Sequence, residues 1–251
     1  MIPMAQSLLN APIGLTGVSS FLYTFHVLYR LMCFASSHNE SSQYNFDSHE
    51  ETRILTTLRI LLLDACLLSL FMLQHTLMAR EEMKNIYIKL GIGEIERSIY
   101  NATSSASLSF LMNNWQGVPW VSLWNIETSE SNVALMVFLG CHIFGWCVIY
   151  SGCLMMDFAE LAGLKQIYYK FTSRSCPLSV KSKELCRYYA HMRHPSFIGF
   201  LIVLWIRPSM TIDRLLLSSL LTIYMIMMWS VDQDDCRYHA NAIQRKRRHL
   251  S

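Results

Sequence analysis

Charged residues are scarce in this sequence of 251 residues: Asp, Glu, Lys and Arg make up 16% of it, whereas a soluble domain carries about 25%. Apolar residues make up 52%, and the mean hydropathy is +0.26. A soluble protein of this length would need more charge to cover its surface, so a water-soluble enzyme is excluded and a polytopic membrane protein is predicted. The net charge of +3 is too small to indicate specific nucleic acid recognition.

The sequence also lacks paired cysteines. Its eight cysteines include no Cys-x-x-Cys pair, and five of them fall in the apolar segments described below, so neither a disulfide framework nor a zinc site is supported. Internal repeats, low-complexity tracts and long linkers are absent as well. We therefore expect residues 1–251 to form a single multi-pass membrane domain.

Six apolar segments are candidates for membrane spans, which need about 20 mostly apolar residues to cross about 30 Å of hydrocarbon. The predicted fold class is all-α, a polytopic membrane helix bundle of about six transmembrane segments. Whether the short fifth segment spans fully stays open. The segments cover residues 9–34, 54–78, 99–112, 133–156, 195–206 and 215–231.

The basic residues are distributed unevenly over the connections between these segments. Sixteen Lys and Arg residues lie in 79–98, 157–193 and the end of the chain, which includes a basic tail at 237–251, whereas the alternate connections hold three, Arg53, Arg207 and Arg214. Because basic loops stay on the cytoplasmic side, both termini are predicted to face the cytoplasm or nucleoplasm. The loop 35–53, which carries the sequon Asn39-Glu40-Ser41, is then luminal.

Several polar residues lie within the predicted spans, where ionisable groups face the bundle or a cavity. For Asp64 a buried hydrogen bond and an ion pair with Arg59 are the alternatives. His75 lies three helical turns later on the same face, either in a site or as a histidine at the helix end. His26 and His142 are expected to be packing histidines.

The segment 99–112 is rich in small residues, which let another helix approach closely. Its pairs Ala102/Ala106 and Ser105/Ser109 predict a packing helix inside the bundle. The segment 157–193 is the longest piece outside the spans, and it is expected to begin with an interfacial helix that continues out of the fourth span.

The sharpest local motif is Arg193-His194-Pro195, followed by Gly199. Proline in a first helical turn is tolerated and keeps the preceding residue extended. A guanidinium at the mouth of this segment can hold a carboxylate or phosphate, and an imidazole can ligate a metal or transfer protons.

Because four segments bring polar residues to one membrane face, we predict a pocket bounded by His75, Arg193, His194 and Asp232. The alternative is a closed ion-pair cluster that only locks the helices. That cluster would join the following residues: Arg193 and Arg237 with Asp157 and Asp235.

Six ordered stretches make the sequence similar to the nurim family, multi-pass proteins of the inner nuclear membrane. The resemblance runs from about residue 54 to the tail and implies a nuclear inner membrane location with both termini nucleoplasmic. The stretches are Gln74–Ala79, Glu96–Tyr100, Asp157–Tyr169, Met192–Pro195, Thr211–Leu217 and Asp232–Tyr238.

Through this family the sequence resembles the isoprenylcysteine carboxyl methyltransferases, which bind S-adenosylmethionine around an Arg-His-Pro helix hairpin. This resemblance implies an isoprenylcysteine-methyltransferase-like fold and a cofactor site. The implied cofactor-binding residues are Arg193, His194, Gly199, Asp232 and Asp235. The sequence departs from that pattern in two places: a Gly-Pro-Tyr turn is absent before Arg193, and Asp232-Gln-Asp-Asp235 replaces a Glu-Glu pair.

The sequence also resembles the NnrU-like membrane proteins, some of which bind haem. That resemblance implies His75 and His194 as metal ligands. Three functions therefore stay open: an interaction role at the nuclear envelope, with lipid bilayer, lamina or chromatin as partners; a membrane methyltransferase acting on a lipidated or lipophilic acceptor; and a haem-binding protein.

Overall fold

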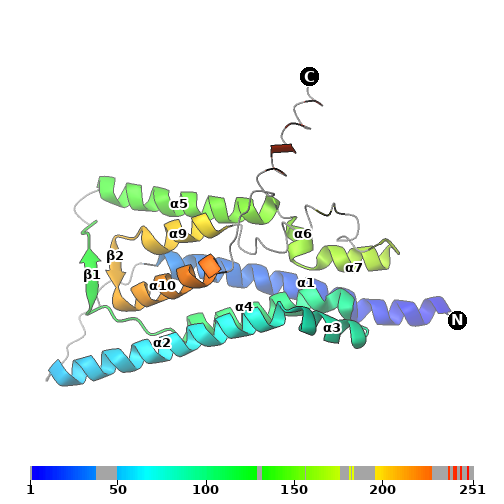
Figure 1. Cartoon of the computed structure of the whole chain (residues 1–251), viewed down its shortest axis with the longest axis horizontal. Helices are drawn as coiled ribbons and strands as arrows, with labels where there is room; N and C mark the ends of the chain where they lie inside the picture. Colours follow the sequence, from blue (N-terminus) through cyan, green and yellow to red (C-terminus); the bar gives the residue numbers. More distant parts are fainter. Residues whose placement is uncertain are drawn as a thin grey trace.

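The computed structural model is a bundle of helices lying along one long axis (Figure 1). It describes residues 2–37, 50–128, 132–155, 157–175 and 196–227, and single residues in the remaining stretches. Within these ranges the order of elements is as follows: α1 (Ile2–Ser36), α2 (Glu50–Met78), α3 (Glu81–Lys89), the 3-10 turn η1 (Gly93–Ile95), α4 (Glu96–Asn114), β1 (Ser122–Asn125), α5 (Asn132–Met155), α6 (Phe158–Leu161), α7 (Leu164–Phe171), α9 (Phe197–Trp205), β2 (Ser209–Thr211) and α10 (Ile212–Met227).

Each apolar segment predicted from the sequence contains a helix, and the chain is mostly helical. Three helices in the described ranges are long and apolar enough to cross a membrane: Ala11–Ser36, Glu51–Met78 and Asn132–Leu154. At 1.5 Å per residue, the nine-residue helix α9 is about 14 Å long, which is shorter than the hydrocarbon core.

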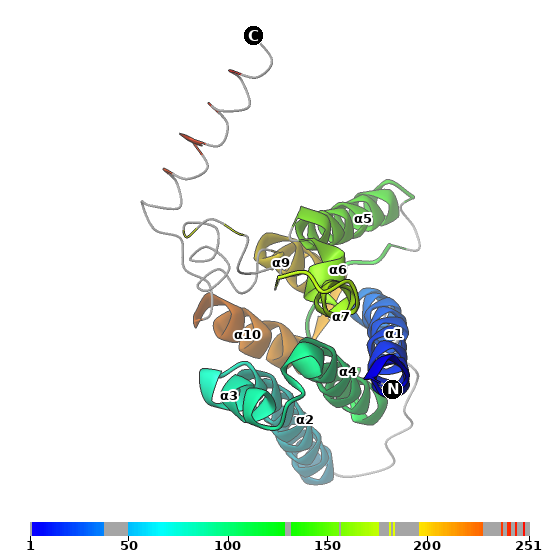
Figure 2. The ribbon, with the colours of Figure 1, turned by 90° about the vertical axis from the view of Figure 1, so that its right-hand side faces the viewer.

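Helix α4 lies between α1 and α2, and its contacts give the directions of all three. Ser20 Oγ donates to Ser98 O and Arg30 donates to Ser109 Oγ, so α1 and α4 run parallel. Gln74, near the end of α2, lies beside Thr103 in α4, whereas Asp64, earlier in α2, accepts from Gln116 just after the end of α4, and so α2 runs antiparallel to α4. Figure 2, which views the helices nearly end-on, shows α4 between these two neighbours.

The second group is α5, α9 and α10. A Cβ on Gly152 would meet Ser196 Oγ at 2.7 Å, while His142 lies beside Ile206 O, so α5 and α9 are antiparallel. Helices α9 and α10 form a hairpin in which Ser218 Oγ donates to Leu204 O at 3.0 Å. The six helices that coincide with predicted spans therefore alternate in direction along the chain.

The connection between α9 and α10 contains a short strand, which corrects the expectation of an all-α fold. Strand β2 pairs antiparallel with β1, forming a two-stranded ribbon in a chain expected to be all-α. We call this end of the bundle the ribbon end and the opposite end the Met78 end.

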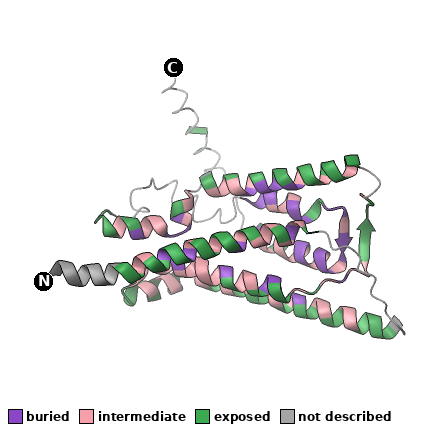
Figure 3. Ribbon diagram, turned by 180° about the vertical axis from the view of Figure 1, so that it is seen from behind, coloured by how far each residue is buried: buried purple, intermediate pink, exposed green. Residues whose placement is uncertain are grey.

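The buried residues concentrate on α9, β2 and the start of α10, whereas the outer faces of α2 and α5 are exposed (Figure 3).

The expected interfacial helix after the fourth span is also corrected. Asp157 has φ of 60° and Gly163 has φ of 84°, and a left-handed residue ends a helix. The chain therefore bends twice, which separates α5, α6 and α7. Helix α7 then packs along α1, where a Cβ on Gly14 would lie 3.3 Å from the Phe171 ring.

Candidate functional site

His75 lies in the last turn of α2 and is the one predicted metal ligand within the described residues. Its ring is 5.2 Å from that of Tyr100 and 6.4 Å from that of Tyr224, with Phe71 at 5.7 Å. The Tyr100 hydroxyl lies 2.9 Å from Nε2, and Ser104 Oγ lies 3.4 Å from Nδ1. Three helices, α2, α4 and α10, thus enclose this imidazole, which we call the His75 cluster.

The His75 cluster continues onto neighbouring polar groups at the Met78 end. Gln74 Nε2 lies 3.2 Å from Thr103 Oγ1, and the Thr76 and Tyr224 hydroxyls are 3.0 Å apart. Gln74 Oε1 is buried without a hydrogen bond to any described residue. Tyr100 and Tyr224 were not predicted at this site, since they lie 25 and 149 residues from His75 along the chain.

The contacts of His75 bear on the predicted haem site. Iron ligation needs a ring nitrogen with a free lone pair, whereas Nε2 lies within hydrogen-bonding distance of the Tyr100 hydroxyl. In this geometry the Tyr100 hydroxyl would have to move before Nε2 of His75 could ligate iron, and the haem site stays a prediction. Within the described ranges no three His, Cys, Asp or Glu side chains are grouped as metal ligands.

The predicted cofactor residues are described at one position. Arg193, His194, Asp232 and Asp235 lie outside the described residues, so the pocket predicted around them stays a prediction. Gly199 is described, and it packs against α5: a Cβ there would lie 2.6 Å from Gly145 O and 2.7 Å from Ile149 Cγ1. Its missing side chain therefore permits a close helix contact.

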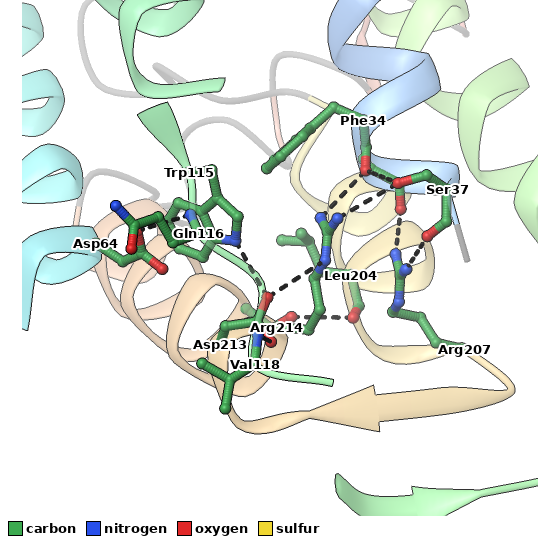
Figure 4. A network of polar contacts seen from close by, with 12 residues as sticks. Phe34, Ser37, Asp64, Trp115, Gln116, Val118, Leu204, Arg207, Asp213 and Arg214 are labelled. Atoms are coloured by element: carbon green, nitrogen blue, oxygen red, sulfur yellow. Dashed lines mark hydrogen bonds and ion pairs between the residues drawn. The ribbon is translucent and has the colours of Figure 1, made fainter. Parts of the chain in front are cut away.

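A network of buried charges, absent from the predicted site, lies at the ribbon end (Figure 4). Arg207 donates to the carbonyl oxygens of Ala35 and Ser37, and Arg214 donates to Phe34 O at 3.1 Å. The last carbonyls of a helix lack intrahelical partners, and cations near them are favourable. The two guanidinium groups therefore cap α1, and with Asp213 we call them the α1 clasp.

Asp213 holds the α1 clasp to the segment before the ribbon. Its carboxylate accepts from Trp115 Nε1 and from the backbone N–H of Val118, both at 3.1 Å, and lies 3.8 Å from Arg214 Nε. Asp64 lies on the other side of this segment and accepts from Gln116 N at 3.2 Å. Four separate segments are thereby joined.

The structure decides between the two alternatives for Asp64, a buried hydrogen bond and an ion pair with Arg59. Its carboxylate makes a buried hydrogen bond, whereas Arg59 is exposed, because five residues of helix turn it about 140° away.

Burial lowers the pKa of Arg207 in the connecting turn to about 10, so Arg207 stays charged at neutral pH. The sequence did carry a signal here, since Arg207 and Arg214 lie on the side otherwise poor in basic residues.

The two packing histidines have different outcomes. His142 is buried, with Nδ1 3.2 Å from Ser36 Oγ and Nε2 2.9 Å from Ile206 O, which confirms that prediction. His26 is exposed on the outside of α1, so the prediction that it packs inside the bundle is wrong. The packing prediction for α4 is confirmed for Ser105, which is buried and donates to Thr24 Oγ1, and for Ser109, which accepts from Arg30. It is wrong for Ala106, which is exposed.

Ion pairs at the Met78 end hold the bend after α5. Lys165 Nζ lies 2.5 Å from Asp157 Oδ2, and Lys181 Nζ lies 2.9 Å from Glu160 Oε2. These described contacts give Asp157 a different partner from those in the predicted ion-pair cluster. Beside them, Asn101 donates to Leu161 O at 2.7 Å, which ties the bend to α4.

The geometry defines a class: a membrane protein whose helices are held together by buried polar contacts between neighbours. Comparison with known proteins gives the family. The chain is 37% identical over 241 residues to a nurim homolog of Drosophila pseudoobscura pseudoobscura, covering 94% of this chain and 95% of the relative. It is 40% identical over 191 residues to nurim of Rattus norvegicus, covering 75% of this chain and 72% of that protein.

The chain belongs to the nurim family. No family model matches it, and no solved structure matches it.

Proposed function

We propose that this chain is a multi-pass protein of the inner nuclear membrane with a structural or interaction role at the nuclear envelope. The alternating direction of six helices is the observation that carries the multi-pass part of the proposal, and membership of the nurim family supports the nuclear location. It supports a topology in which α1, α2, α4, α5, α9 and α10 all lie within the bilayer. The short helix α9 is then shielded by α5 and α10 and reaches only part of the way across.

The charge distribution supports the orientation. The connections at the Met78 end include α3, α6 and α7, whose Lys and Arg residues belong to the basic segments 79–98 and 157–193. With this end in the nucleoplasm, both termini are nucleoplasmic and the ribbon end is luminal. Trp120 and Trp124, beside and within β1, fit that placement because tryptophan favours the membrane interface.

An interaction role is supported by what the buried polar groups do. The hydrogen bonds of the α1 clasp and of the polar groups on α4 run to other segments of the same chain, so these groups serve packing. Arg207 Nε and Arg214 Nε make no hydrogen bond to a described residue. The basic nucleoplasmic connections and the tail are then the surfaces that contact lamina, chromatin or anionic lipid. A polybasic segment close to a membrane is attracted to anionic lipid by about 1 kcal/mol per basic residue.

Selective permeabilisation tests the location and the orientation together. A tag on either terminus should form a nuclear rim, stay hidden when only the plasma membrane is opened, and become accessible when the nuclear membranes are also opened. A tag inserted at Asn39 should be protected in sealed microsomes, whereas a terminal tag should be digested. A reticular pattern that stains after plasma-membrane opening would place the chain outside the inner nuclear membrane.

A methyltransferase is the second candidate, and the α9–α10 hairpin favours it. The hairpin directly follows the Arg193-His194-Pro195 motif, in the same order as in the methyltransferases that the sequence resembles. In such a site S-adenosylmethionine supplies the methyl group, and this chain's residues hold and orient it: Arg193 and His194 at the hairpin mouth, and Asp232 or Asp235 at the ribose. Binding of S-adenosylhomocysteine, measured by calorimetry, would favour this candidate over the first.

A further inference from the structure

One face of α1 is exposed from Leu15 to Cys33. Its residues recur every three or four positions, so they lie within about 80° of one another around the helix, and each is exposed. We call this face the α1 stripe. It consists of Leu15, Ser19, Leu22, His26, Tyr29 and Cys33.

The opposite face of α1 already has its partners. Val27 is 1% exposed in the core shared with α2, α4 and α10, and Ser20 bonds to α4. By contrast, Leu22 and Tyr29 on the α1 stripe are 60% and 56% exposed. The stripe therefore faces outward, away from the part of this chain that the structure describes.

His26 makes the α1 stripe unlike an ordinary lipid-facing surface. The span Ala11–Ser36 has its midpoint about 4 Å from His26 along the helix axis. No described residue makes a hydrogen bond to its imidazole. Ionisable groups at this depth almost always face protein or a water-filled cavity, which indicates that another protein surface covers this histidine.

Other exposed polar residues on the long helices have an alternative that His26 lacks. Arg59 on α2 lies about 12 Å from the start of its span at Glu51, and its long side chain can reach toward the interface. An imidazole has a short arm and cannot. His26 therefore needs a hydrogen-bonding partner at its own depth.

The chemistry of the α1 stripe fits a second copy of itself. A neutral imidazole has one donor and one acceptor, and the hydroxyls of Ser19 and Tyr29 both donate and accept. A two-fold axis sets the same surface against itself, which is favourable only if like groups can bond. The stripe contains no Asp, Glu, Lys or Arg, so like residues meet without charge repulsion. The stripe residues recur at alternating intervals of four and three positions, which is the spacing of contact residues between two helices that cross at a small angle.

We propose that two copies of this chain associate in the bilayer through the α1 stripe, with their two α1 helices parallel and their His26 imidazoles hydrogen-bonded to each other. This inference goes beyond the proposed function and rests on the part of it that places α1 across the membrane. It also assigns a reason for a histidine in the middle of a lipid-facing surface.

Native cysteines provide a matched test in membranes. Cys33 lies on the α1 stripe, while Cys66 on α2 and Cys147 on α5 are also exposed but lie on other faces. Three variants each keep one of these cysteines and replace the other seven with alanine, and each is oxidised with copper phenanthroline. A disulfide needs the two Cα atoms within about 7 Å. We expect a covalent homodimer from the Cys33 variant at a yield at least tenfold above those of the other two.

Substitution of the histidine then tests the chemistry of the interface. In the Cys33 background His26→Leu should lower the yield of covalent dimer about fivefold or more, because the hydrogen bond is lost. His26→Asn keeps one donor and one acceptor and should retain most of it. Phe25→Leu, on the neighbouring exposed face, should leave the yield unchanged.

Three results would overturn the proposal: equal yields from the three cysteines, which is random collision; a Cys33 adduct with a protein of another mass, which is a different partner; or equal yields from His26→Leu and the parent. An N-terminal glycosylation tag together with the Asn39 sequon reports separately whether α1 crosses the membrane. A crossing α1 without a Cys33 dimer refutes the interface alone, whereas a non-crossing α1 refutes the proposed topology.

Discussion

Arg214 lies over the ring of Phe34, with its guanidinium carbon 4.4 Å from the ring centroid, while it also donates to the Phe34 carbonyl oxygen. These residues are 180 positions apart, and the contact joins the start of the last described helix to the end of the first. A cation over an aromatic face is stabilised further when both are desolvated, and the Arg214 side chain is 5% exposed. Arg214 therefore holds the first described helix to the last one at the ribbon end.

Replacing Arg214 with methionine should destabilise the bundle. The change removes the cation that pairs with buried Asp213 and leaves Phe34 O without its guanidinium donor. Breaking a buried ion pair costs about 3–5 kcal/mol, so the melting temperature of the detergent-solubilised protein and its abundance in cells should both fall. Arg59→Met is the control, because Arg59 is exposed and should change neither. Equal melting temperatures for the two variants would show that the α1 clasp does not hold the fold.

Gly199→Ala should separate α5 from α9. The new methyl group would lie 2.6 Å from a backbone oxygen of α5, and overpacking of this kind costs about 1–3 kcal/mol. Gly140→Ala on α5 is the matched control, since nothing lies within 4 Å of a Cβ there and alanine favours a helix. We expect a lower melting temperature for the first and an unchanged or higher one for the second. If instead Gly199→Ala keeps its stability and loses only ligand binding, then Gly199 lines a cofactor site.

The bend after α5 should loosen in acid. The hydrogen bond from Lys165 holds the pKa of Asp157 below its ordinary value. A carboxylate with a depressed pKa stabilises the fold at neutral pH, and this contribution is lost as the pH falls below about 4 toward the depressed value. The pair is partly exposed, so its contribution is at most about 1 kcal/mol.

Limited proteolysis of residues 157–175 measures that loosening. Cleavage should be slow at neutral pH and faster in acid, and Lys165→Met should raise the rate at neutral pH. Lys84→Met is the control, because its partner Glu81 is 3.8 Å away and 87% exposed. A Lys165→Met protein cleaved no faster than the Lys84→Met protein would mean that the ion pair does not hold the bend.

Variants at the predicted pocket separate a binding site from a purely structural cluster. His194→Ala should leave folding and the nuclear rim intact while abolishing ligand binding, since a pocket residue mainly contacts the ligand. A structural role predicts reduced abundance or loss of the rim instead. The ligands to be tried are S-adenosylhomocysteine by calorimetry and haem by its Soret band.

His75 provides the second half of that experiment. His75→Phe keeps an aromatic ring among Phe71, Tyr100 and Tyr224 but removes both nitrogens. If haem is the ligand, both His75→Phe and His194→Ala should lose the Soret band, and Tyr100→Phe should strengthen it by freeing Nε2. If His75 only packs, His75→Phe should change stability without changing any binding signal.

The sequence alone determined which residues form the long helices, and it predicts which face of the membrane each end meets. Three signals carried this information: the scarcity of charge, runs of about 20 apolar residues, and the uneven distribution of Lys and Arg. Each of them extends over more than one helical turn of sequence. These sequence signals do not depend on which helices pack against a given segment. The ordered stretches Gln74–Ala79 and Asp157–Tyr169 determined the family for a similar reason, since they belong to the chain itself.

Only the tertiary structure decided which way each polar side chain faces. In a soluble helix the polar face reveals the outside, but the faces of a membrane helix are all apolar, and lipid is no more polar than the core. His26 was therefore placed inside and lies outside. Arg207 and Arg214 belong by sequence to a connection poor in basic residues, and the structure shows them buried against α1. Gly199, identified through a cofactor motif, supports a close contact with α5, because the distance between two backbones depends on a neighbour more than 50 residues away along the chain.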